Sequence, residues 1–303
     1  MGSLEEVVNL IRKSEVECVF NYRSLLGESP VWSRKDKCLF WVDIEGYSFN
    51  RFNPITRENL ATKTNQKICC LAIDSNDGFI VATENGFHKY NPQSNQLSLI
   101  TDPENDKPNN RFNDGKCDRA GRFWAGTMVQ KGLQKNASLY CLDNDYNCTK
   151  KYDGLILCNG IAWSPDDKVM YLADTRIPIV WAFDYDIQTS DISNRRVFIE
   201  FDEHEGVPDG AAIDNLGGYW IAIPRASQIR RYTDKGEIDT IIELPITKPT
   251  MCAFGGANLN TLYITSNSHQ FTRKQLREQP LAGSIFALNI NYQGMPEPEF
   301  RGN

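Results

Sequence analysis

The sequence predicts an all-β protein, a six-bladed β-propeller with a short N-terminal helix. The first observation behind this prediction is a repeated unit, in which a short apolar strand is followed by a polar turn and a second strand with alternating aromatic residues. The segment NGIAWSPDDKVMYLADT, which begins at Asn159, is one example. The second observation is that strand follows strand without helical patterns between them, which disfavours a parallel α/β sheet.

The repeat occurs six times along the 303 residues. One apolar position can be taken as equivalent in each unit: Trp32, Ile73, Cys117, Trp163, Ile213 and Phe254. Successive positions are 41, 44, 46, 50 and 41 residues apart, by subtraction of these residue numbers. A blade of four antiparallel strands needs roughly 40 to 50 residues, and propellers have about four to eight blades. We therefore expect a single propeller domain over residues 15–303.

We expect residues 1–14 to form a helical extension that precedes the propeller. Ser3 and Glu6 have the spacing of a capping box, in which paired side chains bond free backbone N–H groups at a helix start. The apolar face of this helix would be formed by Leu4, Val7, Leu10 and Ile11. The segment has acids early and no long apolar core, so we do not interpret it as a secretory signal.

Composition and charge disfavour several classes of function. The net charge of −6 disfavours a general nucleic-acid binder, because neutralising phosphates requires a basic face. No apolar run reaches the length of a membrane span. The nine cysteines include no C-x-x-C pair, so we interpret them as reduced thiols of a cytoplasmic protein. We expect no nucleic-acid or membrane partner, and a monomer or weak dimer.

A second equivalent position lies four residues before each anchor of the repeat. We call these six residues the ring: Glu28, Cys69, Asn113, Asn159, Asp209 and Thr250. Equivalent positions of successive blades are related by rotation about the propeller axis. If the innermost strands contain the ring residues, their side chains face one central channel at one level.

Four of the ring residues are acids or amides, which predicts a metal site. Ca²⁺, Mg²⁺ and Mn²⁺ take such oxygen ligands, whereas Zn²⁺ more often recruits His or Cys. The alternative is that the Asn-Gly and Asp-Gly pairs, such as Asp114-Gly115, are simply turns between strands. Turns explain the glycines, but they do not explain why acids and amides recur at the same position of the repeat. We expect one divalent cation, Ca, Zn, Mn or Mg.

Several segments resemble the regucalcin, gluconolactonase and luciferin-regenerating-enzyme family, and most of all its animal regucalcin branch. They are LGESPVW, NNRFNDGKCDRAGRFWAGTM, NGIAWS, FDYDIQTSDISNRR, VPDGAAID and AFGGANLNTLYITS, and they extend over nearly the full length. This resemblance implies a six-bladed propeller with one catalytic divalent metal in the central channel. It also implies the activity of an intracellular lactonase.

The same resemblance assigns roles to individual residues. Glu28 in GESP, Asn159 in CNG and Asp209 in VPDG match the metal ligands of the family. Arg111 and Asn113 in NNRFNDGK match its substrate contacts. A carboxylate can both bind a metal and accept a proton, so Asp209 is the candidate for activating water.

The sequence departs from the family after AGTM, where related chains have acids and one acid touches the substrate. Here the segment is MVQKGLQK, with Lys131 at the corresponding place among the substrate contacts. The lid over the pocket is therefore more basic, which would suit a more acidic lactone or another ester.

These observations predict a metal-dependent hydrolase that opens sugar lactones, a lactonase of the gluconolactonase type. The metal would act in the central channel as Lewis acid and activator of water. Two alternatives remain open. One is a phosphotriesterase that hydrolyses organophosphates at the same site. The other is a calcium-binding propeller without catalytic activity.

Overall fold

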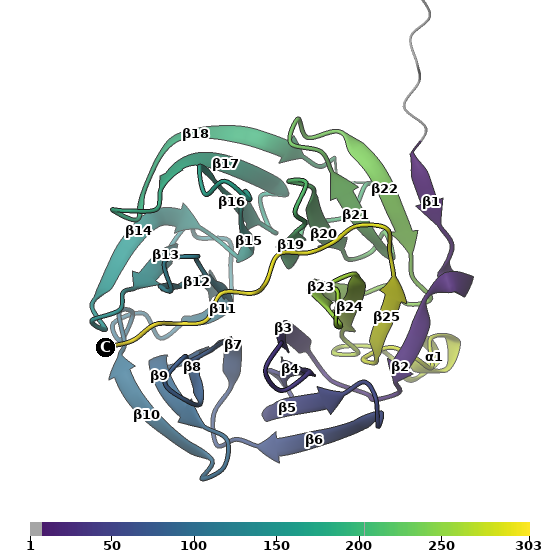
Figure 1. The fold of residues 1–303 in the computed structure, drawn as a ribbon, viewed down its shortest axis with the longest axis horizontal. Helices are drawn as coiled ribbons and strands as arrows, with labels where there is room; N and C mark the ends of the chain where they lie inside the picture. The colour runs from purple at the N-terminus through teal and green to yellow at the C-terminus, as the bar shows by residue number, and fades with distance from the viewer. Residues whose placement is uncertain (1–7, 203) are drawn as a thin grey trace, which may run out of the picture.

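Six antiparallel sheets surround a central axis in the computed structural model, which describes residues 8–202 and 204–303 (Figure 1). Blade 1 contains β3 (Gly27–Ser33), β4 (Cys38–Asp43), β5 (Ser48–Asn53) and β6 (Glu58–Lys63). Blade 2 contains β7 (Ile68–Ile73), β8 (Phe79–Thr83), β9 (Gly86–Asn91) and β10 (Gln96–Thr101). Blade 3 contains β11 (Asn110–Cys117), β12 (Phe123–Val129), β13 (Ala137–Leu142) and β14 (Cys148–Leu155).

The second half of the ring continues the same pattern. Blade 4 contains β15 (Cys158–Trp163), β16 (Val169–Asp174), β17 (Ile179–Asp186) and β18 (Asp191–Glu200). Blade 5 contains β19 (Ala211–Ile213), β20 (Tyr219–Ile223), β21 (Gln228–Tyr232), β22 (Ile238–Glu243) and the added strand β1 (Asn9–Ile11). Blade 6 contains β23 (Pro249–Gly255), β24 (Thr261–Ser266), β25 (Ile285–Asn289) and β2 (Glu17–Phe20). The predicted six-bladed propeller is confirmed.

Blade 6 closes the ring with strands from both ends of the chain. Its outer strand β2 pairs antiparallel with β25, and Cys18 lies opposite Phe286 in this pairing. The N-terminal strand therefore fills a sheet edge that would otherwise be free.

The prediction of an N-terminal helix is wrong for those of its residues that the structure describes. Ser3, Leu4, Glu6 and Val7 lie outside the described residues. Leu10 and Ile11 lie in β1, which pairs in parallel with β22 through Leu10 and Ile241. A helix this short is marginal in water, whereas the free edge of β22 offers backbone hydrogen bonds to a strand.

Two short helices are present within residues 8–202 and 204–303: the 3₁₀ turn η1 (Lys13–Glu15) and α1 (Arg273–Glu278). None of the helices described there has the length and apolar character needed to cross a membrane. All nine cysteines are free thiols, as expected from their spacing.

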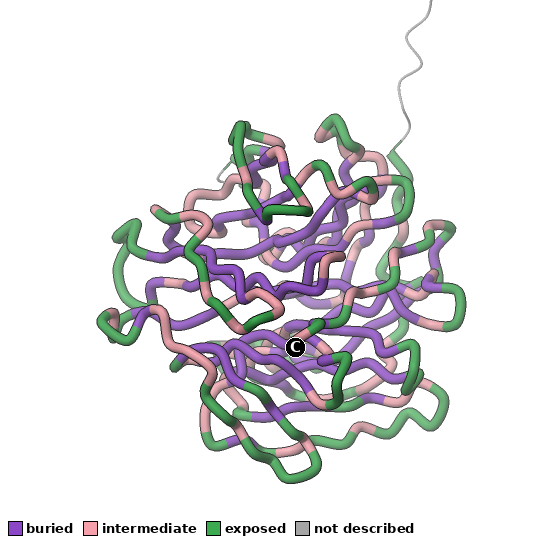
Figure 2. The backbone as a smooth tube through the Cα atoms, turned by 60° about the vertical axis from the view of Figure 1, so that its left-hand side comes forward, coloured by how far each residue is buried: buried purple, intermediate pink, exposed green. Residues whose placement is uncertain are grey.

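The core lies between the blades and around the axis, and the outer strands face solvent (Figure 2). Every residue of β4 is buried, whereas β6 at the outer edge of the same blade is largely exposed. Trp41, Trp124 and Trp220 have no exposed surface. The aromatic residues that alternate in the sequence therefore supply the apolar contacts between neighbouring blades.

The C-terminal segment, residues 290–303, crosses the face of the propeller where the inner strands end (Figure 1). Met295 and Glu297 line a cavity of about 30 Å³ there with Trp163 and Phe254. The buried Lys116 lies 3.6 Å from Glu297. This segment therefore covers the axis at the face opposite the ring.

Candidate functional site

The ring residues of five inner strands lie where the pairing with the next strand is irregular. The register shifts between Glu28 and Val31, Ile68 and Cys70, Phe112 and Gly115, Asn159 and Ala162, and Pro249 and Met251. A β-bulge changes the direction of a side chain and is common beside active sites. The ring residue of each of these strands therefore lies at or beside a break in the regular ladder. The reading of Asp114-Gly115 as a turn is wrong, because both residues lie inside β11.

The residue that follows the ring position takes an unusual backbone conformation in two blades. Ser29 has φ 49° and Gly160 has φ 64°, the left-handed region that favours glycine. A Cβ atom at Gly160 would lie 2.5 Å from the Tyr219 hydroxyl oxygen. Glycine is therefore required in the NG pair, both for its φ and for the space it leaves.

Asn113 connects the predicted substrate residues to the predicted metal residues. Its Oδ1 accepts a hydrogen bond from Arg111 Nη1 at 3.2 Å. Its Nδ2 donates to the carbonyl oxygen of Cys158 at 3.0 Å and to Asn159 Oδ1 at 3.1 Å. Both amide hydrogens of Asn113 are used inside the protein, so its main visible role is to position its neighbours.

Arg111 is held by one end of its guanidinium group. Nη1 donates to the carbonyl oxygen of Phe112 at 2.7 Å and lies 3.7 Å from the Cys69 thiol, in addition to its bond to Asn113. The other guanidinium nitrogens bond to no atom of the described residues and are not among the buried unsatisfied atoms. These N–H groups are free to donate to a bound molecule.

Glu28 and Asp209 are two half-buried acids at the ring position of blades 1 and 5, and they have few protein donors. Glu28 Oε2 accepts one hydrogen bond, from the backbone N–H of Ser29 at 3.0 Å. Burial raises the pKa of Glu28 to about 8, with a further contribution from the negative charge of Asp114. Burial also raises the pKa of Asp209, and the charges of Glu28 and Asp114 add to the effect. An acid in this situation is destabilised in its charged form until a cation approaches.

Asp114 is a member of this group that the sequence reading missed. Its carboxylate accepts hydrogen bonds from the backbone N–H of Gly115 at 2.8 Å and of Ile161 at 3.3 Å. Burial raises its pKa, and Lys116 opposes that rise. The negative charge is therefore concentrated where blades 1, 3 and 5 meet the axis. The Asp-Gly pair marks this position in the sequence, but the sequence analysis gave it no role beyond the alternative of a turn.

Thr175 is a second residue that sequence reasoning missed. Its hydroxyl accepts a hydrogen bond from Asn159 Nδ2 at 2.7 Å and donates to the carbonyl oxygen of Pro208 at 2.8 Å. Thr175 thereby fixes the amide orientation of Asn159, and it links this residue to the backbone immediately before Asp209. Thr175 directly follows β16 and belongs to no sequence motif that would have revealed this link.

Lys131 forms no hydrogen bond or ion pair with the other predicted site residues in the described ranges. Its side chain is exposed, while its backbone N–H and carbonyl pair with the side chain of Asn109 at 3.2 and 2.8 Å. The segment after β12 is thus anchored to the chain just before Arg111. Its ammonium group forms no hydrogen bond or ion pair with any residue in the described ranges.

The donor set fits a hard divalent cation better than a zinc ion. Glu28 and Asp209 supply two carboxylates without a strong protein donor, and Asn159 supplies an amide oxygen whose orientation is fixed from both sides. No cluster of three or more His, Cys, Asp or Glu residues suited to a metal occurs in the described part of the chain. The mixture of two carboxylates with amides is typical of oxygen-ligated cations rather than of a His or Cys centre.

Comparison with known proteins adds to this geometry. The family described as SMP-30/Gluconolactonase/LRE-like region matches residues 26–268. The chain belongs to this family. The matched range contains Glu28, Arg111, Asn159 and Asp209, so the family segment includes the whole candidate site.

Family members of known name are similar over nearly their full length. YvrE of Bacillus subtilis, which its name proposes to be a sugar lactone lactonase, is 37% identical over 93% of this chain and 97% of its own. Regucalcin of Danio rerio is 36% identical over 95% of this chain and 99% of its own. A calcium-binding regucalcin of Agrobacterium tumefaciens has the same fold, with a TM-score of 0.92, 25% identity and coverage of 97% and 100%. The luciferin-regenerating enzyme gives a TM-score of 0.86 at 28% identity, over 95% and 99%.

Proposed function

We propose that this chain is a divalent-metal-dependent hydrolase that opens sugar lactones. The observation that supports it best is the pair Glu28 and Asp209, two half-buried acids whose charges act on each other and which form no ion pair within the described residues. The kinship with a protein named as a lactonase supports the same choice of reaction.

Glu28, Asn159 and Asp209 would hold the cation. When bound, it supplies Lewis-acid polarisation of the lactone carbonyl and lowers the pKa of water at the site. Three protein ligands leave room for substrate and water around a cation that takes about six to eight oxygens.

Asp209 would accept the proton of the attacking water. A carboxylate is a suitable general base when its pKa lies closer to neutrality than usual, and burial raises the pKa of Asp209. Attack of water on the carbonyl carbon and cleavage of the ring C–O bond give a hydroxy acid. Asn159, fixed by Asn113 and Thr175, keeps its oxygen pointed at the same place throughout.

Arg111 would hold the substrate through its free guanidinium N–H groups, which suit hydroxyl, carboxylate or ester oxygens. Asn113 keeps Arg111 in position and has one oxygen lone pair left for a substrate hydroxyl. Lys131, exposed on the segment after β12, would favour substrates with a negative group outside the lactone ring.

The test is to remove bound metal with a chelator and to add back Ca²⁺, Mn²⁺, Mg²⁺ and Zn²⁺ separately. Each form is assayed on neutral and anionic sugar lactones beside an organophosphate. We expect lactone hydrolysis with at least one cation and none without. Hydrolysis of the organophosphate alone would point to a phosphotriesterase, and cation binding without turnover of any compound to a binding protein.

A further inference from the structure

Three blades have a cationic side chain at the same place on their sheets. In blade 5, Arg231 of β21 lies between Trp220 of β20 and Thr240 of β22 in the cross-strand pairing. The equivalent trios are Ile80, Lys89 and Ser98 in blade 2, and Phe40, Arg51 and Leu60 in blade 1. Each trio forms one wall of the space between its blade and the next.

In blade 5 this space is filled by an aromatic ring from the C-terminal segment. The ring of Tyr292 lies 4.2 Å from the guanidinium carbon of Arg231 and 5.3 Å from the ring of Trp220. Its hydroxyl lies 3.2 Å from Thr240 Oγ1. Tyr292 thus touches all three residues of the trio, in the geometry of a cation–π contact.

In blade 2 the cation of the trio also lies over a tyrosine ring. The ammonium group of Lys89 lies 4.1 Å from the ring centre of Tyr146, which comes from the turn between β13 and β14. The ring of Phe300 packs against Tyr146 at 5.6 Å. In both blades, therefore, the cation of the trio is covered by a phenol ring of the same chain.

In blade 1 the corresponding space is open. Phe40, Arg51 and Leu60 line a hollow of about 320 Å³ between blades 1 and 2. Within residues 8–202 and 204–303, the guanidinium group of Arg51 has no hydrogen bond, ion pair or aromatic ring against it. Known ligand pockets begin at about 300 Å³, so the volume suits a small molecule with a single ring.

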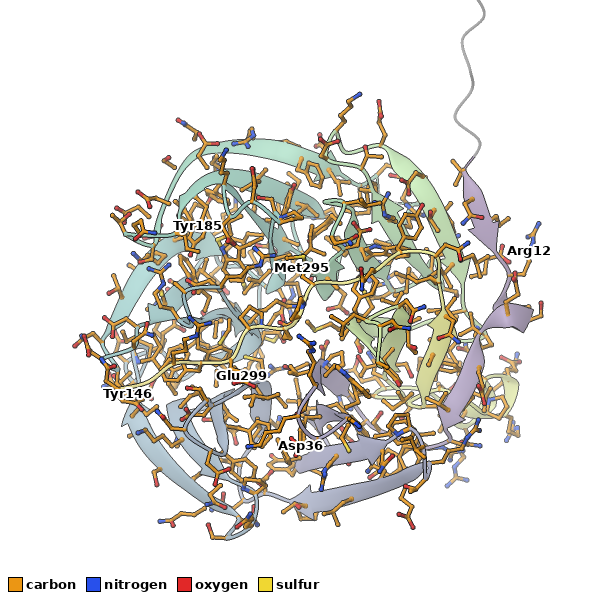
Figure 3. All side chains as sticks on the ribbon, in the orientation of Figure 1. Arg12, Asp36, Tyr146, Tyr185, Met295 and Glu299 are labelled. Carbon is orange, nitrogen blue, oxygen red and sulfur yellow. The ribbon has the colours of Figure 1, made fainter. Side chains whose placement is uncertain are left out.

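The rim of the hollow is acidic. Four carboxylates line it, and they outnumber its two cations, Arg51 and Lys35. Two of the acids, Asp36 of the β3–β4 turn and Glu299 of the C-terminal segment, are labelled in Figure 3. The other two are Asp74 and Asp77. A ligand with a positive group beside its ring would match this excess of negative charge.

We propose that this hollow is a second binding site, which takes a small phenolic amine with its ring on Arg51. The protein itself shows the occupant class twice, as Tyr146 on Lys89 and Tyr292 on Arg231. The hollow is lined by residues near the ends of inner strands, such as Ile73, and by the C-terminal segment, whereas the ring residues lie near the beginnings of those strands. The site is therefore separate from the proposed lactonase site and does not depend on it.

The experiment measures binding of three phenols to the full chain by calorimetry and ligand-observed NMR. The probes are tyramine, p-cresol and 4-hydroxyphenylacetate, which share the ring and differ in charge. We expect saturable binding in the order tyramine, p-cresol, 4-hydroxyphenylacetate. Arg51→Ala should weaken tyramine binding about tenfold, because the cation–π contact is lost, and Arg51→Lys should retain most of the binding, because it keeps the cation.

The matched control is Arg34→Ala, which removes an exposed cation next to Lys35 that does not line the hollow. It should bind tyramine as the wild type does. Circular dichroism of each variant verifies the fold. The proposal is overturned if none of the phenols binds saturably in the millimolar range, if Arg51→Ala binds tyramine normally, or if 4-hydroxyphenylacetate binds most tightly. Displacement of tyramine by gluconolactone would also overturn it, since that places the ring in the channel.

Discussion

Acidic side chains with little exposed surface occur near both ends of the inner strands, and the two groups differ in the partners that the chain gives them. One group lies where the inner strands end, on the face opposite the ring. There, Asp118 directly follows β11 and has no exposed surface. It accepts hydrogen bonds from Arg122 Nε at 2.7 Å, Trp124 Nε1 at 2.8 Å and the Tyr185 hydroxyl at 2.7 Å. Tyr185 is labelled in Figure 3.

Asp214 repeats this arrangement in blade 5. It accepts hydrogen bonds from Arg231 Nε at 2.6 Å, Trp220 Nε1 at 2.9 Å and the backbone N–H of Gly218 at 2.8 Å. At the ring, by contrast, the one hydrogen bond found for Glu28 comes from the adjacent backbone. A buried acid with its own donors holds a hairpin together, whereas an acid without them is available to an external cation.

The largest effect should come from Asp209→Ala, which removes one of the acids of the ring. We expect lactone hydrolysis to fall by at least about 10²–10⁴-fold, the usual contribution of a general base, with cation binding weakened as well. The measurement is kcat/KM with saturating metal, beside a cation titration by calorimetry. Near-normal turnover would remove Asp209 from both roles.

Asp118→Asn should have the opposite signature. The loss of its charge leaves Arg122 buried without an anion, and breaking such a pair typically costs about 3–5 kcal/mol. The free energy of unfolding from urea titration should fall by that order, while kcat per folded molecule stays unchanged. An Asp118→Asn protein that is as stable as the wild type, or one that is folded but has a low kcat, would contradict the structural role of Asp118.

The propeller could be predicted from the sequence because its repeat is a property of the chain itself. Trp32, Trp163 and the other anchors all lie in the inner strands where the spacing placed them. Strand β1 could not be predicted, because Leu10 and Ile11 suit a helix face and a strand equally well. The choice between them depends on the free edge of β22, which is remote in sequence.

The same division applies to the site. Glu28, Asn159 and Asp209 could be picked out because rotation about the axis makes them equivalent. Asp114 could not, because its place in a bulge depends on pairing with β12 rather than on its neighbours. Similarly, the use of both amide hydrogens of Asn113 depends on a carbonyl group of the next blade.

A smaller effect should distinguish Glu28→Gln from Glu104→Gln, the same change at a half-buried and a buried acid. Without metal, burial raises the pKa of Glu28 to about 8, so at neutral pH folding forces this carboxyl to take up a proton. Glu28→Gln removes that cost, so unfolding free energy in chelator should rise by about 0.5–2 kcal/mol. Added cation should no longer stabilise this variant, whereas a bound cation stabilises the wild type by about 2.7 kcal/mol at one hundred times its Kd.

Glu104 supplies the control because its carboxylate has four donors: Lys107, Asn110, Thr127 and Tyr140. Glu104→Gln should lower the unfolding free energy by about 1–3 kcal/mol, because hydrogen bonds of a buried group are lost. The cation should still stabilise this variant. Destabilisation of Glu28→Gln in chelator would mean that Glu28 belongs with the structural acids.

The smallest effect concerns His88, a buried base with neutral partners. Its Nδ1 lies 3.2 Å from the carbonyl oxygen of Gly86, and its Nε2 lies 3.4 Å from Gln66. Burial lowers its pKa from the ordinary value of 6.5, although the charge of Asp102 opposes the shift. Below about pH 6.5 the unfolded chain therefore binds a proton that the folded chain refuses. Stability from this group is present above that pH and is lost as the pH falls through it.

His88→Gln keeps a polar side chain of similar reach and should flatten the fall in unfolding free energy between neutral and mildly acidic pH. Urea titrations at several pH values measure the slope, and NMR of the His88 ring gives its pKa in the folded state directly. An unchanged slope, or a His88 that titrates above its ordinary value, would contradict the argument. The folded chain would then stabilise the charged ring rather than exclude its charge.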